Sequence, residues 1–246
     1  MTYLKSVSAG LALAAIATVA HAQSAPIKIG SFASITGPAA FLGEPTKKTL
    51  ELFVDKINKE GGVNGRKISL ILYDSKSNAK EAGAIAKRLV DQDEVDIVIG
   101  GTITGETMAA LPTFEEAKIP FISLAGASVI IDPVKKYTFK TPHTDRMSVE
   151  KVYDRVSRDG LKNVGLLSGA AGYDQSCRKN AQDAAPKFGV KVVADEQHGA
   201  GDTDLTAQLT KIRAANPDAV LYCGAGAASS IAAKNYRQLG MAPKLY

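Results

Sequence analysis

Short apolar runs alternate with longer amphipathic segments along most of this chain. The runs are rich in β-branched residues and are bounded by turn residues, a pattern that is typical of strands. The predicted strands are Ile27–Phe32, Ile68–Tyr73, Val95–Gly100, Pro120–Leu124, Tyr137–Lys140, Val164–Ser168, Val190–Ala194 and Ala219–Cys223. Segments with helical spacing of apolar residues separate them, near 43–60, 78–92, 105–117, 147–159, 174–188, 203–215 and 227–239.

Residues that favour helix ends stand at the borders of several predicted helices. Asn78 can cap one helix start, and Asp204 or Thr203 can cap another, because their side-chain oxygens accept hydrogen bonds from free amides. Glycines follow four of the helices, where a left-handed C-terminal cap is favoured, at Gly61, Gly160, Gly189 and Gly240. These residues support the predicted helix boundaries.

Two of the predicted strands are apolar on both faces. Residues 95–100 read VDIVIG and residues 163–167 read NVGLL, and strands of this kind are covered by helices on both sides, as in parallel sheets. The order strand, helix, strand also requires crossover connections. The expected fold class is therefore α/β, with doubly wound parallel sheets.

The alternating pattern runs twice, which indicates two lobes. We assign residues 23–143 to the first lobe and residues 144–246 to the second. The segment around Pro142 is the expected crossing, because proline stiffens a linker, although the segment also fits a surface loop within one larger sheet. The second lobe has only three predicted strands, and the chain stops at Leu245-Tyr246, where another strand would begin. We therefore expect the second lobe to be incomplete.

The first 22 residues have the composition of an export signal. Lys5 supplies a positive charge, and residues 7–20 (VSAGLALAAIATVA) are almost wholly apolar. This stretch is shorter than the roughly 20 residues that span a bilayer. Small residues, Ala20 and Ala22, stand at the positions that a signal peptidase reads. We expect cleavage after Ala22 and a mature protein in the periplasm.

The basic residues do not form a nucleic-acid surface. The net charge is +5 and the pI is about 9.0, but lysines and arginines are scattered along the chain and tryptophan is absent. Proteins that bind nucleic acid cluster their basic residues and interleave them with aromatic residues. We therefore expect no nucleic-acid partner.

The chain also lacks the sequence motifs of common enzyme and metal sites. It contains no glycine-rich nucleotide loop, no nucleophile elbow and no H-E-x-x-H motif. His143 and His198 stand alone, as loop or surface residues do. Cys177 and Cys223 either pair in an oxidising compartment or remain separate thiols, at least one of them buried. We expect no enzymatic activity, no metal and no cofactor.

Several short motifs occur in a fixed order along the first lobe. They are IKIG at 27–30, TGPA at 36–39, INKEGGVNGRKI at 57–68, YDS at 73–75, VIG at 98–100 and EEAKIPFIS at 115–123. Together they resemble the leucine/isoleucine/valine-type periplasmic binding proteins, the type I solute-binding proteins of ABC importers. The resemblance implies a monomer that captures a small-molecule solute by cleft closure and presents it to permease subunits in the membrane. A sensor of the same fold, for an amide or an amino acid, is the alternative.

The loop after Gly100 opens the helix predicted at 105–117, and it is the expected anion site. Helix N-termini carry unpaired amide donors and about half a positive charge. A solute carboxylate there can accept hydrogen bonds from backbone amides of the loop and from the Thr104 hydroxyl, each contributing about 1.5–3 kcal/mol. The alternative is that Thr104 caps its own helix. Glu106 is expected to match the helix dipole and not to contact the solute.

The resemblance implies solute contacts on both lobes. They fall on Leu42, Thr102, Thr104, Gly105, Ala125, Gly126 and Ala127 in the first lobe, and on Tyr173 and Ala225 in the second. Without the resemblance, Tyr173 fits a surface position equally well, because a glycine-rich loop precedes it.

Three of these positions depart from the family's usual residues. The family usually has an aromatic ring at Leu42, a hydroxyl residue at Ala127 and a tyrosine at Ala225, and its acidic partner for a solute ammonium would follow Tyr246. Besides a branched-chain amino acid, the departures favour an acid without an amine, such as an aromatic carboxylate, or an amide.

Overall fold

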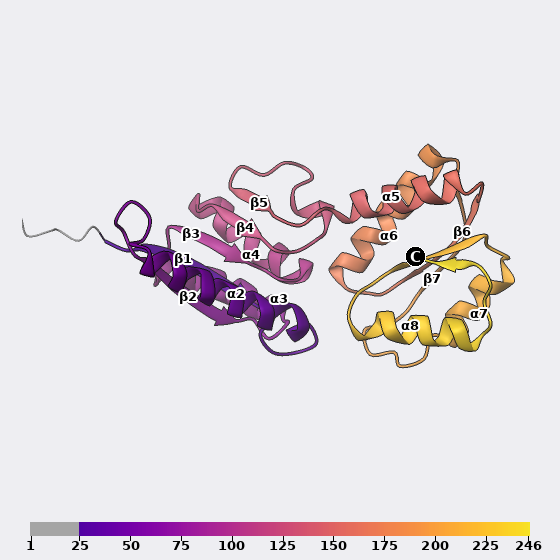
Figure 1. Ribbon diagram of the computed structural model, residues 1–246, viewed down its shortest axis with the longest axis horizontal. Helices are drawn as coiled ribbons and strands as arrows, with labels where there is room; N and C mark the ends of the chain where they lie inside the picture. Colours follow the sequence, from indigo (N-terminus) through magenta and orange to yellow (C-terminus); the bar gives the residue numbers. More distant parts are fainter. Residues whose placement is uncertain (1–24) are drawn as a thin grey trace, which may run out of the picture.

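The computed structural model describes residues 25–246, which form two lobes side by side (Figure 1). The first lobe contains β1 (Ile27–Ala33), α2 (Ala40–Lys59), β2 (Ile68–Asp74), α3 (Ala79–Asp91), β3 (Ile97–Gly100), α4 (Thr104–Ala117), β4 (Phe121–Ser123), η1 (Ser128–Ile130) and β5 (Thr138–Lys140). The second contains α5 (Asp145–Arg158), β6 (Asn163–Ser168), α6 (Gly172–Ala184), η2 (Ala185–Phe188), β7 (Lys191–Gln197), α7 (Thr206–Ala214), β8 (Ala219–Cys223), α8 (Ala227–Gln238) and β9 (Lys244–Leu245). The expected signal peptide, residues 1–22, lies outside the described residues.

Each lobe is built on one sheet whose neighbouring strands are all parallel. The strand order is β2-β1-β3-β4-β5 in the first lobe and β7-β6-β8-β9 in the second. The direction of winding therefore reverses between β1 and β3 and again between β6 and β8. The prediction of two doubly wound lobes is confirmed. The two-residue strand β9 lies where the sequence pattern indicated that another strand would begin.

Helices α3 and α4 pack together on one face of the first sheet. Their core is built around Phe32, Phe114 and Phe121, whose ring centroids lie 4.9 to 6.2 Å apart. Helix α2 is less buried than α3 and α4, because Gly43 is its single fully buried residue. A Cβ atom at Gly43 would lie 2.0 Å from the Ser34 carbonyl oxygen, so only glycine allows this close approach.

The second sheet is covered on both faces, as its apolar strands predicted. Leu166 and Leu221 belong to the core under α5 and α6, whereas Leu167 and Val220 belong to the core under α7 and α8. This division follows from the strand geometry, since successive side chains point to opposite faces. A disulfide joins Cys177 of α6 to Cys223 of β8, with 5.6 Å between the Cα atoms. The sequence left open whether these two cysteines pair, and the structure shows that they do.

The helix ends follow the predicted residues with one exception. The Asn78 side chain accepts hydrogen bonds from the amides of Lys80 and Glu81, and all four predicted glycines have positive φ. The predicted cap of α7 at Asp204 or Thr203 is wrong, because the N-cap residue is Leu205. Asp204 instead accepts from the amide of Thr206, the first helical residue, at 2.7 Å.

The chain passes between the lobes through residues 141–144, which include Pro142, where the crossing was expected. The Lys140 ammonium donates to the carbonyls of Gly126, Pro142 and His143, at 3.2, 2.8 and 3.1 Å. These bonds tie the crossing to the loop that follows β4. Among residues 25–246, no helix combines the length and apolarity that crossing a bilayer requires.

Candidate ligand-binding cleft between the lobes

A cavity of about 730 Å³ lies between the two lobes, at the carboxyl ends of the strands of both sheets. Ligands of doubly wound sheets bind at this edge, where the winding direction reverses. A second hollow, of about 460 Å³, lies between α2 and β2 and away from the strand ends. The cavity is lined by residues 38, 39, 41, 42, 46, 77, 79, 102–105, 124, 126 and 142 of the first lobe and the crossing, and by residues 170–174, 198, 200 and 224–228 of the second.

The helices that reach the cavity present their N-termini to it. The N-cap residues of α2, α4, α6 and α8 are Ala39, Ile103, Ala171 and Gly226, none of which caps its helix with a side chain. Helix α3, whose first residue Ala79 also lines the cavity, is the exception, because Asn78 caps it. Uncapped N-termini leave amide donors free and concentrate positive partial charge. No lysine or arginine is among the residues that line the cavity. Free backbone amides, and not basic side chains, are therefore the groups of the described cavity wall that favour an anion.

The start of α4 shows how the sequence creates these free donors. Gly101 turns the chain out of β3 with φ of 68°, and a Cβ atom there would lie 2.4 Å from Thr107 Oγ1. Ile103 is extended and cannot cap with its apolar side chain. Within residues 25–246, no hydrogen bond is donated by the amides of Thr104, Gly105 or Glu106.

Thr104 holds a buried hydroxyl without a partner. The residue is 3% exposed, and Oγ1 makes no hydrogen bond to any described residue. The alternative that Thr104 caps its own helix is not what the structure shows, because Thr104 is the first residue inside the helix. An unsatisfied buried hydroxyl costs about 1–3 kcal/mol. A ligand oxygen in the cavity would remove this cost.

Glu106 supports the first-lobe side of the cavity from beneath. It is fully buried, and its carboxylate accepts hydrogen bonds from the hydroxyls of Ser34 at 2.7 Å and Ser75 at 2.6 Å. Thr102 Oγ1 accepts from the Ser34 amide at 3.0 Å and lies 3.3 Å from Glu106 Oε2. Thr102 thus lines the cavity with its hydroxyl already bonded inside the protein. Glu106 is not among the lining residues, as expected of a charge that matches the helix dipole.

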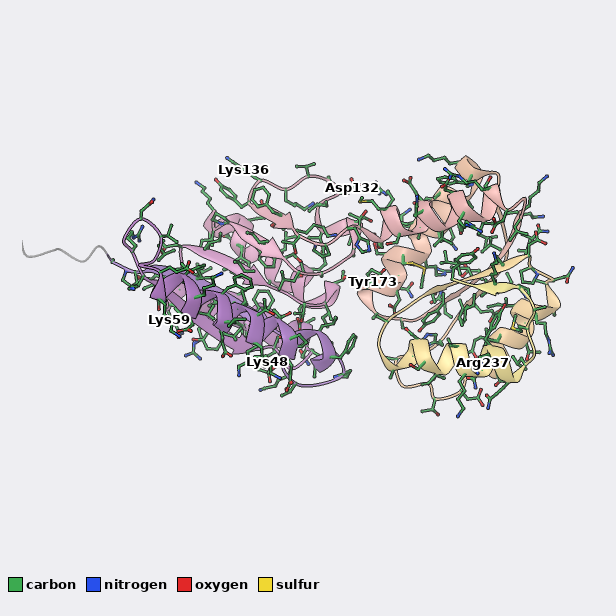
Figure 2. All side chains as sticks on the ribbon, in the orientation of Figure 1. Lys48, Lys59, Asp132, Lys136, Tyr173 and Arg237 are labelled. Atoms are coloured by element: carbon green, nitrogen blue, oxygen red, sulfur yellow. A yellow bond between two sulfur atoms is a disulfide. The ribbon has the colours of Figure 1, made fainter. Side chains whose placement is uncertain are left out.

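The second lobe closes over the first at three close contacts. Gly172 packs against Thr104, since a Cβ atom at Gly172 would lie 3.3 Å from Thr104 Cβ. The Tyr173 ring packs against Gly126, since a Cβ atom at Gly126 would lie 3.0 Å from the ring, and Figure 2 places Tyr173 between the two lobes. Phe41 of α2 packs against Gly226 at the start of α8. Tyr173 is therefore part of the cavity wall and not a ring on the outer surface.

A polar cluster forms the second-lobe wall. His198 is 5% exposed, with Nε2 3.1 Å from the Tyr222 hydroxyl and Nδ1 2.9 Å from the Gly199 carbonyl. His198 lies in the loop after β7, as expected of a loop or surface residue, but it is buried, whereas His143 is an exposed loop residue. Asp174 lies in the first turn of α6, and its Oδ2 accepts from the Ala171 amide at 3.1 Å. Burial raises the pKa of the Asp174 carboxyl, and that hydrogen bond opposes the shift.

The structure brings together seven of the nine residues predicted for the site, namely Leu42, Thr102, Thr104, Gly105, Gly126, Tyr173 and Ala225. Ala125 and Ala127 do not line the cavity, because they pack in a small buried cluster with Ile130. Sequence reasoning missed Phe41, Asp174 and His198. His198 had a usable signal, since it directly follows β7 and so lies at the carboxyl edge of the sheet.

Comparison with known proteins agrees with this geometry. A sequence model of the periplasmic binding protein family matches residues 26–246, and the chain belongs to that family. Leu/Ile/Val-binding protein homolog 7 of Brucella abortus is 28% identical over 221 residues, covering 86% of this chain and 55% of its own length. The leucine-, isoleucine-, valine-, threonine- and alanine-binding protein of Pseudomonas aeruginosa is 25% identical, covering 97% of this chain and 64% of its own length.

Solved structures give the same result. The branched-chain amino acid transporter substrate binding protein of Streptococcus pneumoniae, in complex with isoleucine, superposes with a TM-score of 0.79 at 30% identity, covering 89% of this chain and 63% of that one. An extracellular ligand-binding receptor from Rhodopseudomonas palustris has a TM-score of 0.81 at 28% identity, covering 90% and 60%. Membership in a periplasmic family indicates an extracytoplasmic location. The chain spans little more than half the length of several of these relatives.

Proposed function

We propose that this protein is the extracytoplasmic solute-binding component of an ABC importer and that it captures a small carboxylate solute. The relatives whose names mention a solute bind branched-chain or other small amino acids, which supports a solute of similar size. The protein is proposed to be a periplasmic monomer, cleaved after Ala22, without enzymatic activity. Its partners are the solute and the permease subunits in the membrane.

Capture is proposed to proceed by closure of the two lobes. The solute carboxylate first binds the free amides and hydroxyl at the start of α4. The second lobe then covers it with Tyr173 and the start of α6, where Gly172 already approaches Thr104. A solute stabilises the closed form only by its higher affinity for that form. The permease is proposed to recognise the closed form.

One observation carries the proposal, namely the buried Thr104 hydroxyl without a partner beside three unbonded amides. Removing the hydroxyl removes one hydrogen bond to a charged acceptor, worth about 1.5–3 kcal/mol. Because 1.4 kcal/mol corresponds to a tenfold change in Kd, the Thr104→Val variant should bind carboxylate solutes about 10- to 150-fold more weakly. The Thr104→Ser variant keeps the hydroxyl and should retain most of the affinity.

Isothermal titration calorimetry on the mature protein tests this, after a thermal-shift screen of amino acids, aromatic acids and small amides has identified a ligand. If the wild-type protein and the Thr104→Val variant bound the ligand with equal affinity, Thr104 would not contact the solute. A ligand without any carboxylate that binds more tightly than the acids would contradict the proposed solute class.

A further inference from the structure

Hydrogen bonds between the two lobes occur on only one side of the molecule. Within residues 25–246, every hydrogen bond or ion pair from one lobe to the other joins the segment 126–132 to α5 or α6. The contacts across the cavity, at Gly172 and Gly226, are close packing contacts. In the described part of the chain, the lobes are therefore tied by polar bonds beside the crossing and by packing alone at the cavity.

These polar contacts form a connected set, which we name the interlobe clamp. It consists of Gly126, Ser128 and Asp132 of the first lobe and Asp145, Arg146 and Asn180 of the second. Its inner bonds run from the Asp145 amide to the Gly126 carbonyl at 3.1 Å and from the Ser128 amide to Asp145 Oδ1 at 2.8 Å. Ser128 and Asp145 are buried. Breaking a buried hydrogen bond leaves both groups without a partner, so these bonds should persist while the lobes move.

Asn180 connects α6 to the other members of the clamp. It is 5% exposed, and its Nδ2 donates to Ser128 Oγ at 2.9 Å. Its Oδ1 accepts from Arg146 Nε at 3.2 Å. Arg146 continues the set to the protein surface, where its Nη2 lies 2.8 Å from Asp132 Oδ2. A single buried amide side chain therefore links the first lobe, α5 and α6.

The same face of α6 carries the ring that reaches the cavity. Asn180 lies two helical turns after Tyr173, and residues at this spacing share one face of a helix. Tyr173 packs against Gly126, whose carbonyl oxygen is an acceptor in the interlobe clamp. Helix α6 is thus held to the first lobe at two points along this face, one at the cavity wall and one away from it. Without the bond to Ser128, the helix could tilt and move Tyr173 away from the start of α4.

We infer that the interlobe clamp is the fixed end about which the lobes open and close, and that Asn180 is the positioning residue that holds α6 to it. The inference rests on the lobe closure in the proposed function. Asn180 does not line the cavity, so it acts on solute capture through the orientation of α6 and Tyr173. Movement should be small beside Ser128 and Asn180 and large across the cavity, where polar bonds between the described parts of the lobes are absent.

Distances between the lobes, measured by pulsed electron paramagnetic resonance on the ligand-free mature protein, test this inference. The described residues include no free cysteine, so nitroxide labels can be attached to introduced cysteines. The clamp pair, Phe139→Cys with Lys151→Cys, places labels on exposed positions of β5 and α5, on either side of the crossing. The cleft pair, Lys48→Cys with Arg237→Cys, places them on exposed positions of α2 and α8, which Figure 2 shows on different lobes. The clamp pair should give a narrow distance distribution and the cleft pair a broader one.

Variants of the clamp show whether Asn180 acts through Ser128. Asn180→Ala should broaden the distribution of the clamp pair, and so should Ser128→Ala, which deletes only one hydroxyl and carries the test if the asparagine variant does not fold. The double variant should broaden it no further than Asn180→Ala alone, because both changes remove the same bond. The control is Gln182→Ala, which removes a side-chain amide bond of the same helix, to Asp195 at 2.6 Å within the second lobe. It should leave both distributions unchanged.

Three results would overturn the inference. A lower melting temperature of Asn180→Ala with unchanged distributions would show a purely structural role for that residue. Equally broad wild-type distributions for both label pairs would mean that the lobes move but do not turn about the clamp, and the proposed function would stand. Equally narrow distributions would mean that the lobes do not move, which would count against the proposed closure as well.

Discussion

Breaking the disulfide between Cys177 and Cys223 should destabilise the second lobe and leave the first lobe unchanged. Both cysteines are buried, and they join α6 to the end of β8. The bond closes a loop with a sequence separation of 46 residues. In the chain-entropy treatment, a loop of that length corresponds to about 4 kcal/mol at 25 °C.

This magnitude predicts a large shift in denaturant unfolding. With a urea m-value of about 2 kcal/mol/M, the midpoint of the second-lobe transition should fall by about 2 M. The Cys177→Ala/Cys223→Ala double variant is the suitable perturbation, because alanine adds no polar group to the core. Far-UV circular dichroism follows the transition, since the protein has no tryptophan to report it.

Hydrogen exchange then shows where stability is lost. Amides of β6 and β8 should exchange faster in the double variant, whereas amides of β1 and β3 should be unaffected, because no residue of the first lobe belongs to the core that contains the disulfide. Solute affinity should also fall, since Cys177 lies one helical turn after Asp174 on α6. An unchanged midpoint, or equal acceleration of exchange in both lobes, would refute the reasoning.

A further change probes the cleft itself. The Gly101→Ala variant should lose about 1–2 kcal/mol of stability because Gly101 has a positive φ. The added Cβ atom would also lie 2.4 Å from Thr107 Oγ1, which should cost further stability and weaken solute binding. Urea unfolding measures the stability and calorimetry the affinity, and a variant with the wild-type unfolding midpoint would contradict this prediction.

Most of the fold could be predicted from the sequence because its signals are local. Apolar runs on both faces predicted covered parallel strands: Asn163–Ser168 is buried on both faces, whereas Ile97–Gly100 is buried on one face and half-buried on the other. Asn78 and the four glycines marked helix ends through their own backbone preferences. The start of a further strand near Leu245 followed from the alternation of strands and helices, and β9 lies at that place.

The first-lobe half of the cleft was also accessible from sequence, because the start of α4 directly follows a strand. The second-lobe half was accessible only in part: the resemblance gave Tyr173 and Ala225, whereas Asp174, in the first turn of α6, and His198, after β7, are brought to one wall only by the fold. Isolated in sequence, each has the character of an ordinary surface residue.

The sequence alone determined where strands and helices form, because periodicity and end residues act over a few neighbours. The tertiary structure decided which groups were left without partners. Cys177 pairs with Cys223, Glu106 accepts hydrogen bonds from Ser34 and Ser75, and Thr104 Oγ1 has no partner among the described residues. Hydrogen bonds and burial depend on contacts between distant segments, so this unpaired hydroxyl could be recognised only in the folded molecule.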